Sequence, residues 1–579
     1  MTDITALVAD NIHIWTGAIQ RKSGAGRGGG KRISLYGIER LRALILDLAV
    51  RGKLVQQDGG DEPASELLKR VNAERARLIK SETIGKGKAF ALVSQTPPFE
   101  IPSNWTWTQI SQIGHDWGQR EPSNAFTYID VGSIDQTLGV VQYPNVIAAN
   151  EAPSRARKVV RKGTVLYSTV RPYLLNIAIV DQDFDPEPIA STAFAIIHPF
   201  AGIEAGFLYR YLRSASFVSY VESCQTGIAY PAINDRQFFA AWCPLPPLAE
   251  QGRIVAKVDE LMALCDALER ESAGAMAAHQ ALVDVLLAGL VKSTDAADLA
   301  RQWARLESHF NTLFTTDASI DALKQIILEL AVRGKLVEQD ARDGAASELL
   351  KQTAKGKADL IRQGLAKRDK PLPQVDHSNL PFALPNGWAW ARFPELGIFE
   401  RGKSKHRPRN DPKLFSPGIY PLIQTGEVAR ATGLINEVHS HYSELGLAQS
   451  KLWKAGTLCI TIAANIADAA IMGFDACFPD SVVGFVPAEP ITDPSYLLYF
   501  IRTAKADLLR FAPSTAQKNI NLGILETLLI PCPPLAEQRR IVAKVDALMA
   551  LCDALKARLA DAAQTQRNLA DAITERAAA

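Results

Sequence analysis

Two short stretches of the chain carry many cationic side chains and almost no acids. Residues 152–180 contain six cations and no acid, and residues 401–413 contain six cations beside Asp411 alone. Lysine and arginine neutralise phosphates and displace their counterions, so this chemistry favours contact with DNA. A single basic run is more often a solvated surface, but here one lies in each of two divergent segments. The candidate contacts are Arg155, Arg157, Lys158, Arg161, Lys162, Arg401, Lys403, Lys405, Arg407 and Arg409.

Polar side chains beside these stretches carry hydrogen-bonding groups that could read bases. Arginine, asparagine and glutamine pair with base edges in the major groove, although several of these residues could instead cap turns. Because the net charge of the whole chain is only +2, a nucleic-acid surface must be local. The candidate readers are Ser168, Arg171, Tyr173, Asn176 and Gln225 in the first segment, and Gln424, Thr425, Gln517, Lys518 and Asn519 in the second.

Two other motifs have a catalytic or a structural interpretation. Gly24, Gly26 and Gly29 fit the spacing of a dinucleotide-binding loop, but no strand is expected before them, which favours a flexible basic linker over 20–32. Residues 96–99, Thr-Pro-Pro-Phe, resemble the (Asn/Asp)-Pro-Pro-(Tyr/Phe) signature of amino-group methyltransferases, with Thr where that signature binds the target amine. The second half has only Leu-Pro-Phe at 380–382, so a structural lead-in is favoured.

No other pattern predicts catalysis or a metal. There is no phosphate-binding loop, no His-Glu-x-x-His and no carboxylate–lysine cluster typical of nucleases. Seven cysteines without a Cys-x-x-Cys pair are typical of a reduced, cytoplasmic protein without a zinc site. No apolar run approaches the ~18 residues of a membrane span, and the N-terminus is not a secretory signal. With 579 residues, the chain is long enough for about four domains.

The elements that must position these residues occur twice. PPLAEQGRIVAKVDELMALCDALE at 246–269 returns as PPLAEQRRIVAKVDALMALCDALK at 533–556, and LAVRGKL at 48–54 returns at 330–336. Near-identity at so long a period indicates a duplicated domain pair rather than a solenoid. The stretch 248–375 contains both motifs, and the two ends of the chain contain one each. We therefore expect a circular layout with pseudo-twofold symmetry, in which the termini lie close together.

Each Pro-Pro-Leu-Ala-Glu-Gln segment predicts the start of a long helix, expected over 248–290 and 535–573. The apolar positions follow a heptad, so the two stripes could pack on each other as an antiparallel seam. The LAVRGKL segments predict helices that end at Gly52 and Gly334. The seam residues are Ile254, Val258, Leu261, Cys265 and Leu268 in the first helix, and Ile541, Val545, Leu548, Cys552 and Leu555 in the second.

Two inserts, 98–247 and 376–534, separate these repeats. They share Trp105 and Trp388 near their starts, strand patterns after Gly-Thr at 163 and 456, and aromatic helix patterns from 207 and 496. The remaining sequence diverges, so the inserts are expected to be mixed α+β domains of one fold with different surfaces. Loops are expected over 81–95 and 353–378. The predicted division is 1–97, 98–247, 248–375, 376–534 and 535–579.

The repeated helix starts, the repeated LAVRGKL and two divergent inserts that open near a Trp-x-Trp together resemble one family. The chain is similar to the specificity subunits of type I restriction-modification systems, of the longer-chain branch, over nearly its whole length. The resemblance implies two target recognition domains of mixed α/β structure, separated by long antiparallel coiled-coil-like helices. Each domain would read one half of an asymmetric, bipartite DNA site. The basic segment 20–32 has no explanation in this family pattern.

The same resemblance implies partners that carry the catalysis. Two methyltransferase subunits would hold S-adenosylmethionine and methylate adenine, and two restriction subunits would use ATP and Mg²⁺ for cleavage. The chain itself would bind double-stranded DNA, no cofactor and no membrane. The rival interpretations are a self-contained DNA methyltransferase or fused restriction-methylation enzyme, which would need its own cofactor motif, and a coiled-coil scaffold that does not touch DNA.

Overall fold

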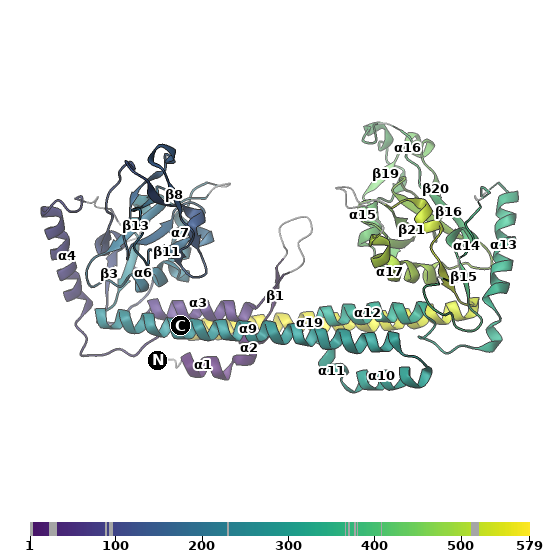
Figure 1. Ribbon diagram of the computed structural model, residues 1–579, viewed down its shortest axis with the longest axis horizontal. Helices are drawn as coiled ribbons and strands as arrows, with labels where there is room; N and C mark the ends of the chain where they lie inside the picture. Colours follow the sequence, from purple (N-terminus) through teal and green to yellow (C-terminus); the bar gives the residue numbers. More distant parts are fainter. Residues whose placement is uncertain are drawn as a thin grey trace. The chain divides into compact units, whose positions relative to one another are not determined.

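The computed structural model describes residues 4–22, 32–86, 90–91, 96–227, 231–364, 366–368, 371–375, 378, 380–406, 408–510 and 520–578. The chain forms two compact units, each with a sheet-rich domain on a helical base (Figure 1). The first unit joins residues 1–276 to the C-terminal segment 561–579, and the second comprises residues 277–560. The boundaries between the units fall inside two long helices, Leu248–Lys292 and Leu535–Ala578.

The C-terminal segment belongs to the same unit as the N-terminus, which confirms the predicted circular layout. Arg567 donates a hydrogen bond to the carbonyl of Ile19 at 2.8 Å, and Lys53 donates one to the carbonyl of Ala578 at 2.9 Å. The helical base of this unit contains α1 (Ile4–Asp10), α2 (Ile12–Gly17), α3 (Tyr36–Val50), α4 (Ala64–Lys80), the first part of α9 (Leu248–Lys292) and the end of α19 (Leu535–Ala578).

The heptad stripe of α9 is buried as predicted, but its partner differs from the predicted one. Ile254, Val258 and Leu261 lie in one core with residues of α3 and the end of α19. The α19 stripe, Ile541 and Val545, lies in the core of the second unit with residues of α12 (Asp317–Val332). The two stripes therefore do not form a seam with each other. Periodicity predicts which face is buried, and several amphipathic helices were available to cover each face.

Ion pairs define the helix directions within the first unit. Arg42 of α3 pairs with Asp266 of α9 at 2.6 Å, whereas Arg40 pairs with Asp571 of α19 at 2.8 Å. Arg40–Asp571 with Lys53–Ala578 makes α3 parallel to the end of α19. Arg42–Asp266 with the hydrogen bond from Gln57, just after α3, to Glu250 makes α3 antiparallel to α9. The two long helices are therefore antiparallel within this unit.

The second unit repeats this base with the roles of the long helices exchanged. Lys324 of α12 pairs with Asp553 of α19. Lys335 donates hydrogen bonds to the carbonyls of Val291 and Ser293 at the end of α9, both at 2.8 Å. The remaining helices of this base are α10 (Ala296–Ser308), α11 (Phe310–Leu313) and α13 (Ala346–Arg362).

The predicted helix stops are also present. Gly52 and Gly334 have φ of +69° and +67°, the left-handed conformation that ends a helix. Among the described residues, α9 is the one helix whose length and composition would let it cross a membrane. That test is weak here, because its apolar half supplies Val283, Leu287 and Leu290 to the core of the second unit.

The first sheet domain packs two sheets against each other. The six-stranded sheet has the order β4-β13-β10-β11-β7-β6, and the four-stranded sheet has the order β8-β5-β12-β9. Residues on β10 alternate as a central strand requires: Leu166 faces the core between the sheets, and Tyr167 faces the helices. Its strands are β3 (Thr106–Gln109), β4 (Gly114–His115), β5 (Phe126–Ile129), β6 (Ile134–Asp135), β7 (Val140–Val141), β8 (Asn145–Ile147), β9 (Ala156–Val159), β10 (Val165–Ser168), β11 (Ile177–Ile179), β12 (Pro188–Ser191), β13 (Phe194–Pro199) and β14 (Trp242–Leu245).

The second sheet domain repeats this topology in a different sequence. Its sheets have the orders β16-β24-β21-β22-β18 and β19-β17-β23-β20. The pairs β22·β18 and β23·β17 are parallel, like β11·β7 and β12·β5 in the first domain. Its strands are β15 (Ala389–Ala391), β16 (Gly397–Arg401), β17 (Tyr420–Leu422), β18 (Leu434–Ile435), β19 (Ser440–Tyr442), β20 (Leu452–Trp453), β21 (Leu458–Thr461), β22 (Ala469–Met472), β23 (Ala476–Cys477), β24 (Val482–Pro487) and β25 (Ile530–Cys532). One fold in both inserts is confirmed.

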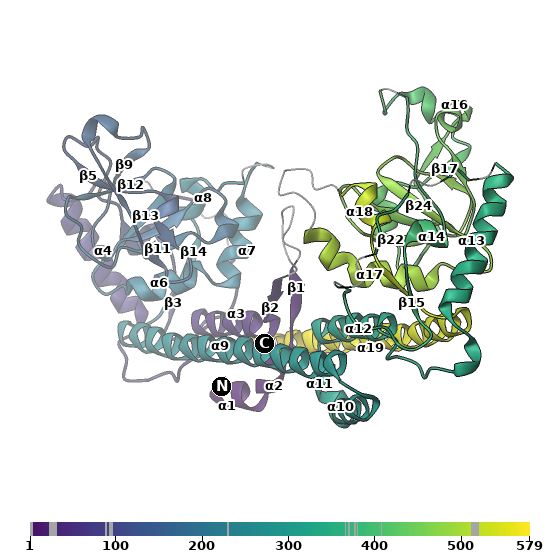
Figure 2. The same ribbon diagram turned by 45° about the vertical axis from the view of Figure 1, so that its right-hand side comes forward.

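The helices of each domain complete its contact with the base. The aromatic helices α6 and α17 pack against α3 and α12, respectively, as Figure 2 also shows for the second unit. The domain helices are α5 (Ile110–Ile113), α6 (Ala205–Leu212), α7 (Ala215–Cys224) and α8 (Asp235–Phe239) in the first domain, and α14 (Phe393–Leu396), α15 (Thr425–Arg430), α16 (Glu444–Ala448), α17 (Ser495–Arg510) and α18 (Leu522–Glu526) in the second.

Two predicted irregular segments contain regular structure. Helix α13 extends to Arg362, so the predicted loop over 353–378 is wrong for its first ten residues, where lysine, alanine, leucine and arginine favour the helix. The predicted linker 20–32 begins and ends in paired strands, β1 (Gln20–Lys22) and β2 (Arg32–Ser34). The glycine motif at Gly24 to Gly29 lies outside the described residues.

Candidate DNA interface

The turn between β10 and β11 carries the most exposed candidate readers of the first domain. Arg171 and Leu175 lie on either side of it with φ of +49° and +52°, so both have a left-handed backbone conformation. Between them, the Tyr173 side chain is 50% exposed. The turn is held by a neighbouring segment: Arg171 N donates to the carbonyl of Pro231 at 2.8 Å, and Ile233 N to that of Thr169 at 3.0 Å.

The second domain has the same turn with different side chains. Ala464 and Ala467 have φ of +63° and +60° between β21 and β22. Ile520 N donates to the carbonyl of Ile462 at 3.0 Å, as Ile233 N does to Thr169 in the first domain. The candidates Gln517, Lys518 and Asn519, which precede Ile520, lie outside the described residues. Arg-Pro-Tyr at one turn thus corresponds to Ala-Asn-Ile at the other.

The candidates Gln424 and Thr425 lie beside this second turn. Thr425 begins helix α15, and its carbonyl accepts a hydrogen bond from Asn465 Nδ2 at 3.4 Å. The Gln424 side chain is exposed, and its amide donates to Ser440 Oγ at 3.3 Å. Asn465, which sequence analysis did not single out, therefore joins these two candidates. Its position inside an otherwise apolar turn was the available signal.

Three candidates of the first domain are structural instead. Lys158 is 8% exposed, and its ammonium donates to the carbonyl of Phe194 at 2.7 Å. Ser168 is 2% exposed and donates to the carbonyl of Val170. Asn176 is 5% exposed and accepts a hydrogen bond from Gln136 at 2.6 Å. Because the polar groups of these buried residues are used inside the domain, the structure removes them from the set of direct DNA contacts.

The cations of residues 155–162 divide between opposite ends of the domain. Arg155 is exposed and lies near the turn. Its carbonyl accepts a hydrogen bond from Thr192 N, and the residue after Thr192, Ala193, accepts one from Thr169 N at the start of the turn. Arg161 and Lys162 are exposed on the loop after β9. Arg157, half-buried, pairs with Glu121 at 3.0 Å. Of these residues, only Arg155 is brought close to the turn.

Arg161 belongs to an aromatic cluster at the other end of the sheet. Its guanidinium lies 3.9 Å from the ring centre of Trp117, which contacts His198. Burial, with His115 and Arg161 nearby, lowers the pKa of His198 to about 4, so this imidazole is neutral at neutral pH. Arg161 is thus used in packing rather than directed at the turn.

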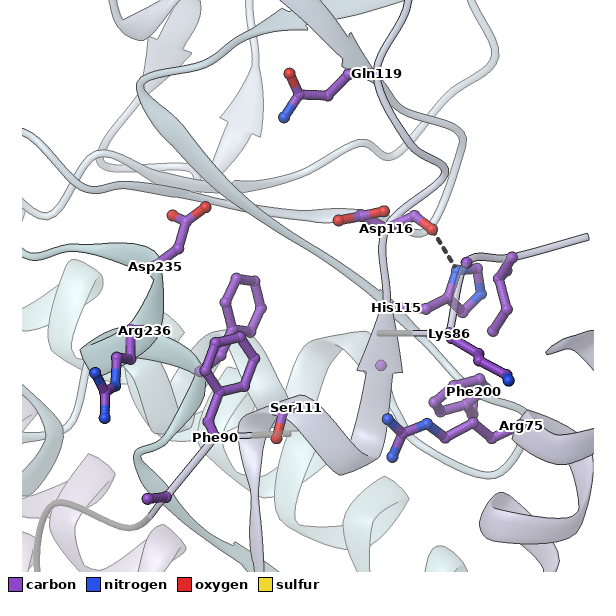
Figure 3. Close-up of a pocket in the computed structure, with 15 residues that line it drawn as sticks. Arg75, Lys86, Phe90, Ser111, His115, Asp116, Gln119, Phe200, Asp235 and Arg236 are labelled. Atoms are coloured by element: carbon purple, nitrogen blue, oxygen red, sulfur yellow. Dashed lines mark hydrogen bonds between the residues drawn. The ribbon is translucent and has the colours of Figure 1, made fainter. Parts of the chain in front are cut away.

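A cleft of about 880 Å³ opens on this side of the first unit, between α4, the chain after it and the sheet domain (Figure 3). Arg75 and Lys86 lie on one side of it, while Asp235 and Arg236 lie on the other. Asp116 also lines it. Because both cations and carboxylates line the cleft, it lacks the uniform positive charge of a phosphate-binding surface.

The basic stretch of the second domain lies at the end of the sheet that carries the turn. Gly402 N donates to the carbonyl of Val482, and Ile462 N to that of Ser481, so the stretch and the turn border the same segment. Arg401, Lys403 and Lys405 are exposed. Arg409, also exposed, pairs with Asp480 at 2.9 Å. Arg407 lies outside the described residues.

Sequence analysis also did not single out two equivalent arginines, Arg213 directly after α6 and Arg502 within α17. Arg213 donates to the carbonyl of Gln136 at 2.9 Å, beside buried Asn176. Arg502 donates to the carbonyl of Thr432 at 2.7 Å. Aligning FLYRYLRS with YLLYFIRT places these two arginines at the same position, which was the available signal.

Each sheet domain is joined to its long helix by a buried tryptophan–glutamate contact. Trp105 Nε1 donates to Glu250 at 3.0 Å, and Trp388 Nε1 donates to Glu537 at the same distance. Both carboxyls lie in the first turn of their helices. Burial raises the pKa of Glu250 and of Glu537, although the indole hydrogen bond acts in the opposite direction in each case.

The described residues contain no group of three or more His, Cys, Asp or Glu side chains that could hold a metal ion. The seven cysteines are unpaired, and six of them are buried. Burial raises the pKa of the Cys265 thiol to about 11, which keeps it protonated and unreactive at neutral pH.

Comparison with known proteins gives one family. The sequence profile of the family described as "Type I restriction modification DNA specificity domain" matches residues 389–564. The chain is 35% identical over 599 residues to the type I restriction enzyme EcoAI specificity subunit of Escherichia coli, with 99% of both chains covered. It is 35% identical over 607 residues to the EcoEI specificity subunit of the same organism, again with 99% of both covered.

A solved structure agrees with this likeness. It is described as "Structural basis underlying complex assembly and conformational transition of the type I R-M system". Its matching chain is 25% identical, with a TM-score of 0.50, and the match covers 83% of the present chain and 99% of that one. The duplicated helical base and the two sheet domains are therefore features of a known architecture.

Proposed function

The chain belongs to the specificity subunits of type I restriction enzymes, and from this premise we propose that each sheet domain reads one half of a split DNA site. One observation carries the proposal: a duplicated base holds two domains of one topology whose exposed turns differ, Arg-Pro-Tyr at 171–173 against Ala-Asn-Ile at 464–466. Domains with a common fold and different turn side chains suit different base sequences, so the proposed site is asymmetric.

The proposed reading surface of the first domain is the exposed turn with Arg155 and Gln225 beside it. Gln225 precedes Thr226, which pairs with Ala232, and Ala232 also pairs with Val170 of the turn. In the second domain it is the corresponding turn with Gln424, Thr425 and the basic stretch from Arg401. Phosphate contacts from the cations would position each domain, and side chains of the turn would select bases. Two half-sites separated by less than ~10 bp, one helical turn, would present the same DNA face to both domains.

The proposed partners carry the chemistry. The specificity-subunit relatives and the type I R-M structure support assembly with methyltransferase and restriction subunits. We place this assembly in the cytoplasm. The pseudo-twofold base supports two copies of each. We place S-adenosylmethionine on the methyltransferase partners, which would methylate adenine, and ATP with Mg²⁺ on the restriction partners. This chain is then non-catalytic and directs where its partners act.

We expect the purified chain alone to transfer no methyl group and to cut no DNA. Addition of its methyltransferase partner should give specific methylation, because the partner supplies the cofactor and the reacting groups. The measurement is transfer of a labelled methyl group to DNA, with chain alone, partner alone and both together. Transfer by the chain alone would support the self-contained enzyme instead. A mixture that neither binds nor methylates DNA would support the scaffold.

We expect Arg171→Ala to weaken or relax reading of the first half-site only. Loss of a two-hydrogen-bond contact with a base reduces discrimination by about 1–3 kcal/mol. The backbone should tolerate the change, because Ala464 adopts the same left-handed conformation in the second domain. Lys162→Ala, on the loop at the other end of the sheet, is the matched control. The effect is measured as methylation of duplexes with single-base changes in the first half-site. If the Arg171→Ala chain discriminates against these changes as strongly as the parent chain does, Arg171 does not read a base.

A further inference from the structure

We propose that the hydrogen bond from Trp105 to Glu250, and its counterpart from Trp388 to Glu537, fix the direction of each sheet domain on its own helix and so select the gap between the half-sites. This inference rests on the proposed function. It assigns a positioning role to the Glu of each Pro-Pro-Leu-Ala-Glu-Gln segment, which would explain why this helix start is repeated while the inserts diverge.

The contact joins the first strand of each domain to the first turn of its helix. Trp105 immediately precedes β3, and Trp388 immediately precedes β15. Glu250 is 0% exposed and Glu537 is 2% exposed, so both hydrogen bonds are shielded from water. A shielded hydrogen bond to a carboxylate is directional and stronger than a neutral one. It therefore resists a change in the angle between the strand and the helix.

Neighbouring contacts prevent the Trp105 ring from moving away. Gly52, at the end of α3, lies against it: a Cβ at this position would be 3.1 Å from the indole and 2.4 Å from Pro102. Gln57, which follows α3, donates to the second oxygen of Glu250 at 2.5 Å. The second unit repeats the close approach, with Gly334 against Pro385 and Trp388.

The next residue of the repeated segment holds the end of the domain. Gln251 donates to the carbonyl of Pro246 at 3.0 Å, and Gln538 to that of Pro533 at 2.9 Å. Gln251 also accepts from Glu204 N at 2.8 Å, at the start of α6. The Glu–Gln pair therefore binds both where the chain enters the domain and where it leaves.

Stability alone does not account for these carboxyls. Because burial raises the pKa of Glu250 and Glu537, ionisation is less favourable in the folded chain than in the unfolded one. Their ionised forms therefore reduce stability as pH rises through the raised pKa. Apolar side chains could replace buried charges with little loss of stability. A directional hydrogen bond from the tryptophan, in contrast, requires a carboxylate oxygen in the first turn of the helix, and both units have one.

The test uses the full chain assembled with its methyltransferase partner. Methylation rates are compared on duplexes that carry both half-sites with the native gap, or with a gap one base pair shorter or longer. Trp105→Phe keeps an aromatic ring and removes the donor, and Glu250→Met removes the acceptor. We expect either change to reduce the preference for the native gap about tenfold, the size of one charge-assisted hydrogen bond. Discrimination against a single-base change within either half-site should persist.

Trp107→Phe is the matched control, because Trp107 lies on the same strand and packs on Phe99 and Trp242 instead of the helix. Trp388→Phe, with Trp390→Phe as its control, repeats the test in the second unit. Melting temperatures identify variants that fold. The inference would be overturned if the Trp105→Phe and Glu250→Met chains fold and keep the original preference for the native gap. It would also be overturned if Trp107→Phe lost as much of that preference as Trp105→Phe. A parent chain with no gapped site would instead refute the proposed function.

Discussion

Ile254→Asp is expected to destabilise the first unit severely. Ile254 is 0% exposed on α9 and packs among residues of α3 and the end of α19. A buried carboxylate with no partner lowers the free energy of unfolding by about 3–5 kcal/mol, a large part of the stability of a domain. Val545→Asp should do the same in the second unit, where Val545 is also 0% exposed.

Calorimetry measures this effect, and the chain should be treated as two units rather than one two-state transition. Leu264→Asp is the matched control, because Leu264 lies on the same helix but is 39% exposed. It should shift the melting temperature little, since exposed substitutions usually change stability by less than about 0.5 kcal/mol. An unchanged melting temperature for both Ile254→Asp and Val545→Asp would contradict the packing of the stripes.

Exchange of residues 98–247 for the insert of another family member is expected to change one half-site completely and to leave the other unchanged. The insert is a self-contained graft, because its first and last strands, β3 and β14, pair antiparallel, with Trp107 opposite Pro244. Its ends therefore lie together on the helix. Base-reading side chains move with the graft, whereas the helices and the second domain stay.

Methylome sequencing of a strain that carries the exchange gives the result. The reciprocal exchange of residues 376–534, joined through β15 and β25, should change only the other half-site. This pair of grafts also tests which domain reads which half. A change in both half-sites after one exchange, or a recognised site without a gap, would contradict the assignment of one domain to one half.

Repetition within the chain was sufficient to predict the architecture. Two copies of a helix start with two divergent inserts predicted one fold for both domains, and the matching strand orders confirm it. The heptad predicted the buried stripes, and the left-handed Gly52 and Gly334 end their helices as expected. These predictions succeeded because periodicity and backbone conformation are local properties, encoded in neighbouring residues.

Tertiary structure decided the partners and the exposure of each side chain. Several apolar faces can cover a stripe equally well, so only the fold shows that α3, rather than the other stripe, covers the stripe of α9. Composition marked Lys158 and Asn176 as polar contacts, but their hydrogen-bond partners, Phe194 and Gln136, lie far away in the sequence, and both side chains are buried. The Trp105–Glu250 contact joins residues far apart in sequence, and such contacts depend on how the chain returns to itself. The local sequence therefore determined the elements and their repetition, and long-range packing determined which side chains remain free to meet DNA.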